Sequence, residues 1–73
     1  MPCRIGITTD PDRQQQEWAA AYPSLYRWQI LGWYRTQDEA RQTERIYATS
    51  RDCEADAGGP SNGPLWAVYQ FEY

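Results

Sequence analysis

A chain of 73 residues forms one small domain, and such a domain buries only about 60% of the surface of its unfolded chain. Its seven basic residues are all Arg, its ten acidic residues bring the net charge to −3, and it has no His, so chemistry that needs Lys or His is excluded. The acidic balance also argues against non-specific binding of nucleic acid, which needs a basic surface.

The first predicted elements are a strand over residues 1–9 and a helix over residues 11–22. The strand alternates apolar and polar residues, and Gly6 within it permits a close approach of another backbone. Asp10 stands where a helix N-cap is expected, and Pro11 suits the first helical position. The expected inner seam of the helix is Trp18, Ala21 and Tyr22.

A second strand over residues 26–35 and a second helix over residues 37–51 follow. The strand carries apolar residues on both faces. Thr36 and Glu39 form the T-x-x-E pattern of a capping box at the start of the helix. The predicted inner stripe of this helix is Ala40, Thr43, Glu44 and Tyr47.

The last predicted elements are a Gly- and Pro-rich loop over residues 52–64 and a strand over residues 65–73. The order strand–helix–strand–helix–strand predicts an α+β fold, a three-stranded sheet with two helices, in a single domain over residues 1–73. Two helices are expected to leave one sheet face uncovered, with these side chains on it: Leu31, Trp33, Trp66 and Val68. That face is either covered by the loop and the strand ends or forms a homodimer or partner surface.

The chain contains two cysteines, Cys3 and Cys53. Their spacing fits no metal-binding motif, and two cysteines alone do not make a disulfide framework. We expect two reduced thiols in a cytoplasmic protein, and the sequence leaves open whether they pair. The N-terminus has no signal-peptide pattern and no stretch approaches the length of a transmembrane helix, so we expect no membrane partner.

Two segments carry a resemblance to a known family: I-G-I-T-T-D-P-D-R at residues 5–13 and I-L-G-W-Y-R-T-Q-D-E-A-R-Q-T-E at residues 30–44. In order and spacing, residues 4–47 resemble the core of the GIY-YIG nuclease domain. That family has a Y-I-G strand, a turn and a helix with a catalytic Arg, followed by a strand and a helix whose Glu binds a divalent metal. The resemblance implies a GIY-YIG-like fold, with Glu44 at the metal-binding position and Mg²⁺ as the metal.

Three positions depart from the pattern of the family. Arg4 replaces the Tyr of Y-I-G, Gln14 stands where the catalytic Arg lies, and Trp18 replaces the His that often follows. Phosphodiester hydrolysis needs a positioned nucleophile and positive charge, usually with a metal, so these losses imply a pseudo-nuclease or a fold relative. The preceding G-I-Y strand is absent, but if the C-terminal strand pairs antiparallel beside the first, Tyr69 can supply a phenol there.

The candidate contacts with an anion, nucleic acid or protein partner are Arg4, Arg13, Arg35, Trp33 and Trp66. Plainer explanations exist for most of them. Arg4 and Arg13 are expected to pair with acidic residues of the first helix and its cap, and the two Trp side chains are expected in core or dimer packing. The plainer explanation of Glu44 is an ion pair with an Arg such as Arg4 or Arg13.

We therefore predict a small non-catalytic binding module, such as a phage or bacterial accessory protein. It would contact a protein partner, or a second copy of itself, through an aromatic and Arg-bearing surface, and it would need no cofactor. The alternative is a GIY-YIG-like domain that binds or cleaves nucleic acid with Mg²⁺. Convergence of Arg4, Arg13 and Arg35 with Glu44 on one concave patch would favour that alternative.

Overall fold

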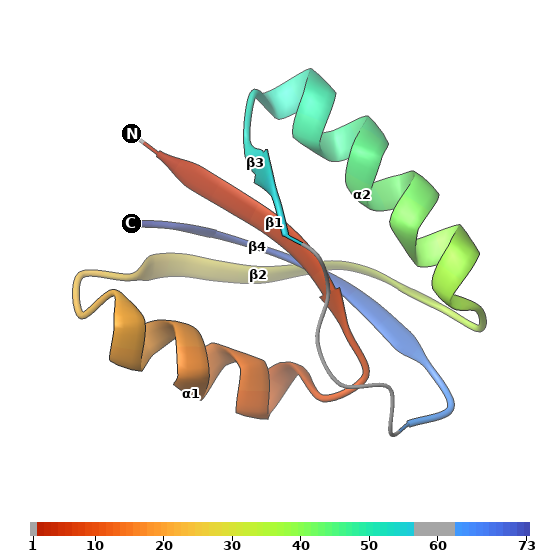
Figure 1. Ribbon diagram of the computed structural model, residues 1–73, viewed down its shortest axis with the longest axis horizontal. Helices are drawn as coiled ribbons and strands as arrows, with labels where there is room; N and C mark the ends of the chain where they lie inside the picture. Colours follow the sequence, from red (N-terminus) through yellow and green to blue (C-terminus); the bar gives the residue numbers. More distant parts are fainter. Residues whose placement is uncertain (1, 57–62) are drawn as a thin grey trace.

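The protein is a mixed four-stranded sheet with one helix against each face (Figure 1). The structure is a computed structural model that describes residues 2–56 and 63–73. Its strands are β1 (Cys3–Thr8), β2 (Tyr26–Tyr34), β3 (Glu54–Ala55) and β4 (Trp66–Glu72), and its helices are α1 (Pro11–Ala21) and α2 (Gln37–Arg51). The order across the sheet is β2-β4-β1-β3, with β4 antiparallel to both neighbours and β3 parallel to β1. The predicted α+β class is confirmed, and the C-terminal strand does pair antiparallel beside the first.

Both helices begin at the caps predicted from the sequence. The side chain of Asp10 accepts a hydrogen bond from the backbone N–H of Arg13 (3.2 Å), and Pro11 lies in the first turn of α1. The hydroxyl of Thr36 accepts from the backbone N–H of Glu39 (3.2 Å) and donates to its carboxylate (3.1 Å). These bonds satisfy backbone donors that have no partner inside the helix, so the local sequence sets where each helix starts.

The core between the sheet and α2 combines aliphatic side chains with Trp66. Its buried members come from β1, α2 and β4: Ile5, Ile7, Ala40, Trp66 and Val68. The partly buried residues packed against it are Leu31, Tyr34, Tyr47 and Cys53. The prediction of an uncovered sheet face is therefore wrong for Leu31, Trp66 and Val68, because α2 covers them. Trp33, the fourth residue of that predicted set, is 51% exposed.

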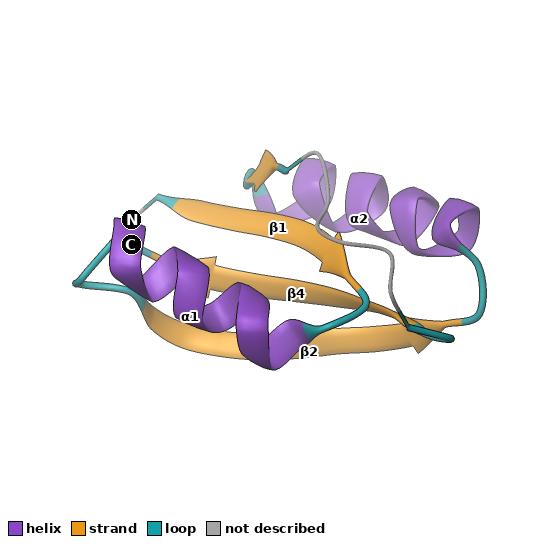
Figure 2. Cartoon of the chain, turned by 60° about the horizontal axis from the view of Figure 1, so that its bottom comes forward, coloured by secondary structure: helices purple, strands orange, loops and turns teal. Residues whose placement is uncertain are grey.

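The opposite face of the sheet, against which α1 lies, is aromatic. Figure 2 shows the two helices on opposite sides of the sheet. Alternation along β4 and the residue after it turns Tyr69, Phe71 and Tyr73 toward α1. The ring centroids of Trp18 and Phe71 are 5.3 Å apart, and those of Tyr22 and Tyr73 are 4.4 Å apart. Tilted aromatic pairs add to stability beyond the area that they bury, so these contacts hold α1 on the sheet.

β2 is an irregular edge strand. Its register against β4 shifts once in its first half and again between Ile30 and Gly32, and Arg27 has a left-handed backbone conformation (φ 55°). Bulges of this kind insert an extra residue and change the face to which the following side chains point. As a result Ile30 and Trp33 both lie opposite residues of β4 that face α1.

The segment over residues 52–64 is predicted to be a loop, but its start contains a short strand. Two of its residues form β3 and pair in parallel with β1, so the sheet has four strands rather than three. Residues 57–62 of the predicted loop lie outside the described residues. Cys3 and Cys53 are joined by a disulfide with their Cα atoms 4.9 Å apart, and the prediction of two reduced thiols is wrong because β3 brings Cys53 beside β1.

We expect Gly6→Ala to destabilise the protein, because a Cβ there would lie 2.5 Å from Cζ of the fully buried Tyr69. The expected loss in the free energy of unfolding is about 2 kcal/mol, measured by urea denaturation. Gly32→Ala is the control, since its nearest neighbour is the end of the half-buried Tyr34 side chain. An equal loss in the two variants would contradict a special role for Gly6.

Candidate functional site

Tyr69 lies where three elements meet. It pairs with Gly6 between β1 and β4, and its ring crosses the space that a side chain at Gly6 would fill. The hydroxyl accepts a hydrogen bond from Nε1 of Trp18 on α1 (2.9 Å) and donates one to Asp56, directly after β3 (3.4 Å). Because Tyr69 is fully buried, its hydroxyl is satisfied by protein groups rather than by solvent.

The surroundings of Tyr69 keep its phenol protonated. Burial raises its pKa above the ordinary value for Tyr, the hydrogen bond from Trp18 lowers it in part, and the charge of Asp56 raises it again. Asp56 is held in place by its backbone N–H, which donates to the carbonyl of Ile5 (2.8 Å). The hydroxyl of Tyr69 is therefore a hydrogen-bonding link between α1, β4 and the residue after β3.

Glu44 is a buried carboxyl on the inner side of α2, as predicted, and is 2% exposed. Its Oε2 atom has no hydrogen-bond partner among the described residues. Burial raises the pKa of Glu44 to about 7. The positive charge of Arg41 lowers this pKa in part, and the negative charge of Asp56 raises it further. The predicted ion pair with Arg4 or Arg13 is wrong, because both guanidinium groups pair with other carboxylates.

Gln14, which stands where the resembled family has its catalytic Arg, is also buried, and its Oε1 atom has no partner in the described part of the chain. Residues 2–56 and 63–73 enclose no pocket and hold no group of three or more Cys, Asp or Glu side chains that could bind a metal ion. Glu44 alone, shielded from solvent, does not fit the octahedral, partly hydrated site that Mg²⁺ prefers.

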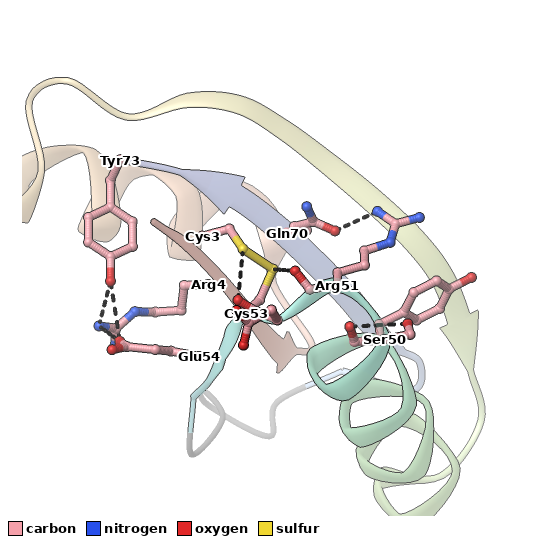
Figure 3. Close-up of a disulfide and its surroundings, with 10 residues drawn as sticks. Cys3, Arg4, Ser50, Arg51, Cys53, Glu54, Gln70 and Tyr73 are labelled. Carbon is pink, nitrogen blue, oxygen red and sulfur yellow. Dashed lines mark hydrogen bonds and ion pairs between the residues drawn. A yellow bond between two sulfur atoms is a disulfide. The ribbon is translucent and has the colours of Figure 1, made fainter. Parts of the chain in front are cut away.

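Arg4 lies in an aromatic cluster that joins β1, α1 and the end of β4. The ring centroids of Trp18, Tyr22 and Tyr73 lie 4.9, 5.9 and 5.6 Å from its guanidinium carbon. The same group forms an ion pair with Glu54 of β3 (2.8 Å; Figure 3), so the predicted pairing with acidic residues of the first helix is wrong. The side chain of Arg4 is 19% exposed, and partial desolvation strengthens contacts between a cation and aromatic rings. Arg4 is thus engaged inside the fold.

Two other predicted contact residues have structural explanations. Arg13 pairs with Glu17 one turn further along the exposed side of α1 (3.4 Å), which is one of the surface ion pairs expected for it. Trp66 is 8% exposed and belongs to the core against α2, so core packing is confirmed for it. Neither residue is therefore a strong candidate for contact with a partner.

Arg4 and Arg35 lie at opposite ends of the sheet. Arg4 is opposite Phe71 of β4, whereas Tyr34, next to Arg35, is opposite Trp66. Five positions along a strand correspond to roughly 17 Å. The predicted Arg residues therefore do not converge with the α2 carboxyl on one concave patch, which was the observation that would have favoured a nuclease-like site.

The described residues leave one exposed apolar surface on the sheet, at the end of β2 that runs beyond α1 (Figure 1). We call it the Trp33 patch, and it consists of Ile30 (37% exposed), Trp33 (51%) and Leu65 (41%), which directly precedes β4. Arg35 is exposed at its margin and makes no ion pair with any described residue. Two of the predicted contact residues, Trp33 and Arg35, are therefore neighbours on an accessible surface.

Sequence reasoning missed two residues that organise these sites. Tyr73 contacts Arg4, and the alternation of aromatic residues along the C-terminal strand is a signal that could have placed it on the α1 side. Asp56 contacts Tyr69, but it stands in a Gly- and Pro-rich segment whose sequence carries no sign of that role. Only its position after β3 brings it to the phenol.

Comparison with known proteins identifies no relative. No family model, no curated protein and no solved structure matches this chain. In the part of the chain that the structure describes, neither helix is long and apolar enough to cross a membrane. The function must therefore be inferred from the surfaces and the buried groups of the molecule itself.

We expect the free energy of unfolding to fall as the pH rises from about 4.5 to about 7, the ordinary and the folded-state pKa of Glu44. Between these values the folded state holds a proton that the unfolded state has lost, so a higher pH favours unfolding. The expected loss is on the order of 2–3 kcal/mol. Urea denaturation across this pH range should show a smaller fall in the free energy of unfolding for Glu44→Gln than for the native protein. Identical pH profiles of the two proteins would contradict a raised pKa of Glu44.

Proposed function

We propose that this protein is a small non-catalytic binding module whose Trp33 patch contacts a segment of another protein. The observation that carries the proposal is the joint exposure of Ile30, Trp33 and Leu65 at one end of the sheet. The ladder places Ile30 opposite Tyr69 and Trp33 opposite Ala67, so both side chains lie on one face of the sheet, and large apolar patches on such a surface mark interaction sites. Trp and Arg are also the residues that most often dominate the binding energy of protein interfaces.

The charges beside the patch indicate the kind of segment that fits. Arg35, directly after β2, makes no ion pair with any described residue, whereas Arg27 at the other end of β2 pairs with Glu72 (3.3 Å). A segment with an apolar side chain flanked by carboxylates complements Trp33 beside Arg35. A second copy of this chain fits less well, since two β2 strands would bring Arg residues together.

The irregularity of β2 supports contact through side chains rather than by addition of a strand. A regular edge strand offers a row of backbone groups to an incoming strand. The two register shifts in β2 interrupt that row. The apolar side chains of the Trp33 patch are therefore the better anchor for a partner.

The alternative is a GIY-YIG-like domain that binds nucleic acid, and one observation favours it. β4 stands antiparallel beside β1, where the G-I-Y strand of the family would lie, and it brings the phenol of Tyr69 over Gly6. Against this alternative stand the protonated, hydrogen-bonded state of Tyr69 and the separation of Arg4 from Arg35. The binding module is therefore better supported.

We expect Trp33→Ala to weaken the binding of peptides selected on the native protein by about tenfold or more. The ligands come from a displayed library of random peptides panned against the immobilised native chain, and they should carry an apolar residue beside Asp or Glu. Ile46→Ala is the control, because Ile46 is 67% exposed on α2, away from the patch. Selected peptides that bind the Trp33→Ala protein undiminished would contradict the proposal.

We expect no cleavage of DNA or RNA oligonucleotides in the presence of Mg²⁺ or Mn²⁺, because Glu44 is buried and lacks partner ligands for a metal. The measurement is gel analysis of labelled single- and double-stranded substrates. Glu44→Ala is the matched variant. Metal-dependent cleavage by the native chain that disappears in this variant would replace the binding module with the nuclease alternative.

A further inference from the structure

The Cys3–Cys53 disulfide lies where the end of α2, the start of β1 and β3 meet (Figure 3). The parallel ladder between β1 and β3 begins with the pair Arg4 and Glu54. Cys3 directly precedes Arg4, and Cys53 directly precedes Glu54. The covalent bond therefore joins the two strands at the start of their contact.

Besides this bond, β3 is held mainly by polar contacts of Glu54 and Asp56 with Arg4, Tyr69 and Tyr73. The strand contributes two residues, and both are exposed. One further backbone bond, from the N–H of Asp56 to the carbonyl of Ile5, continues the contact. Short strands at a sheet edge bury little surface, and an ion pair to an exposed carboxylate such as that of Glu54 adds little. The disulfide is therefore the main restraint on this segment.

The elements on either side of β3 are held independently of it. α2 packs on β1 and β4 through the core, and Arg51 in its last turn donates a hydrogen bond to Oε1 of Gln70 on β4 (2.6 Å; Figure 3). β1 pairs with β4 along its whole length. Opening of the disulfide would therefore free residues 53–56 and leave both helices and the three longer strands in place.

The β3 segment supplies the acidic partners of Arg4. The guanidinium group lies 2.8 Å from the carboxylate of Glu54 and 3.9 Å from that of Asp56. The hydroxyl of Tyr73 donates to Glu54 as well (3.2 Å). Among the described residues no other carboxylate forms an ion pair with Arg4. Departure of β3 would leave this cation among its aromatic rings without a counter-charge and would uncover the outer edge of β1.

We propose that the Cys3–Cys53 disulfide is a redox-operated clamp that fastens β3 to β1 and releases it on reduction by a dithiol. A thiolate of the dithiol attacks one sulfur and breaks the bond, which gives a mixed disulfide, and the second thiol of the reductant then displaces the protein sulfur. The dithiol becomes a disulfide, and Cys3 and Cys53 each gain one electron and one proton. Neither cysteine is fully buried, so the reductant has access. The clamp is separate from the Trp33 patch, which lies at the opposite edge of the sheet.

Amide hydrogen exchange of the native chain with and without dithiothreitol tests the clamp. Reduction is expected to speed exchange of the Asp56 amide by about tenfold or more, while the amides of Val68 and Tyr69 in β4 stay protected, and reoxidation should reverse the change. Unchanged protection of Asp56 would overturn the proposal, because β3 would then not depend on the disulfide. Loss of protection in β4 would also overturn it, since the disulfide would then be a staple for the whole fold.

Two variants separate the disulfide from the ion pair. The combined change Cys3→Ser and Cys53→Ser should show the released pattern without any dithiol. Glu54→Gln removes the carboxylate that pairs with Arg4 but keeps the disulfide, so the Asp56 amide should stay protected. Release of Asp56 in the Glu54→Gln protein would show that the ion pair holds β3 and would overturn the proposal.

Discussion

Gly6 has no side chain, and the packing of the molecule depends on the space that this leaves beside β1. Tyr69 fills it from the neighbouring strand, and its hydroxyl reaches Trp18 of α1 on one side and Asp56 beyond β3 on the other. A fully buried hydroxyl must find partners within the protein, so the position of the phenol constrains both of these residues. The absence of a side chain at Gly6 thus allows Tyr69 of β4 to contact both α1 and the residue that follows β3.

The two faces of the sheet accommodate charge in different ways. On the α1 side the chain, which has no Lys, uses the flat guanidinium of Arg4 among aromatic rings, where its charge is stabilised by the rings and by Glu54. On the α2 side the carboxyl of Glu44 lies against an apolar core and has no hydrogen bond to Oε2 within the described residues. The first group keeps its charge, while burial favours the neutral form of the second.

Local signals in the sequence were sufficient for the helices but not for the sheet edge or for the site. Thr36 and Glu39 predicted where α2 begins, and its bounds are those expected. The two residues of β3 are poor strand formers, and they pair only because β1 lies beside them. Trp33 was predicted as a contact residue and is exposed, but the bulge that turns it to the side of Ile30 leaves no pattern in the sequence. Contacts between distant residues decide these features, and a single sequence does not record them.

β4 lies between β1 and β2 although it follows both along the chain. In the described sheet β1 and β2 do not pair with each other, so they are joined into one sheet only when β4 pairs with both. Pairings that span most of a chain must overcome a large loop-closure entropy before they give any stabilisation, which slows folding. Until then the apolar side chains of β1 lack the neighbours that Trp66 and Val68 of β4 provide, and partly folded chains of this kind are prone to aggregate. The C-terminal segment therefore determines how quickly the chain leaves this vulnerable state.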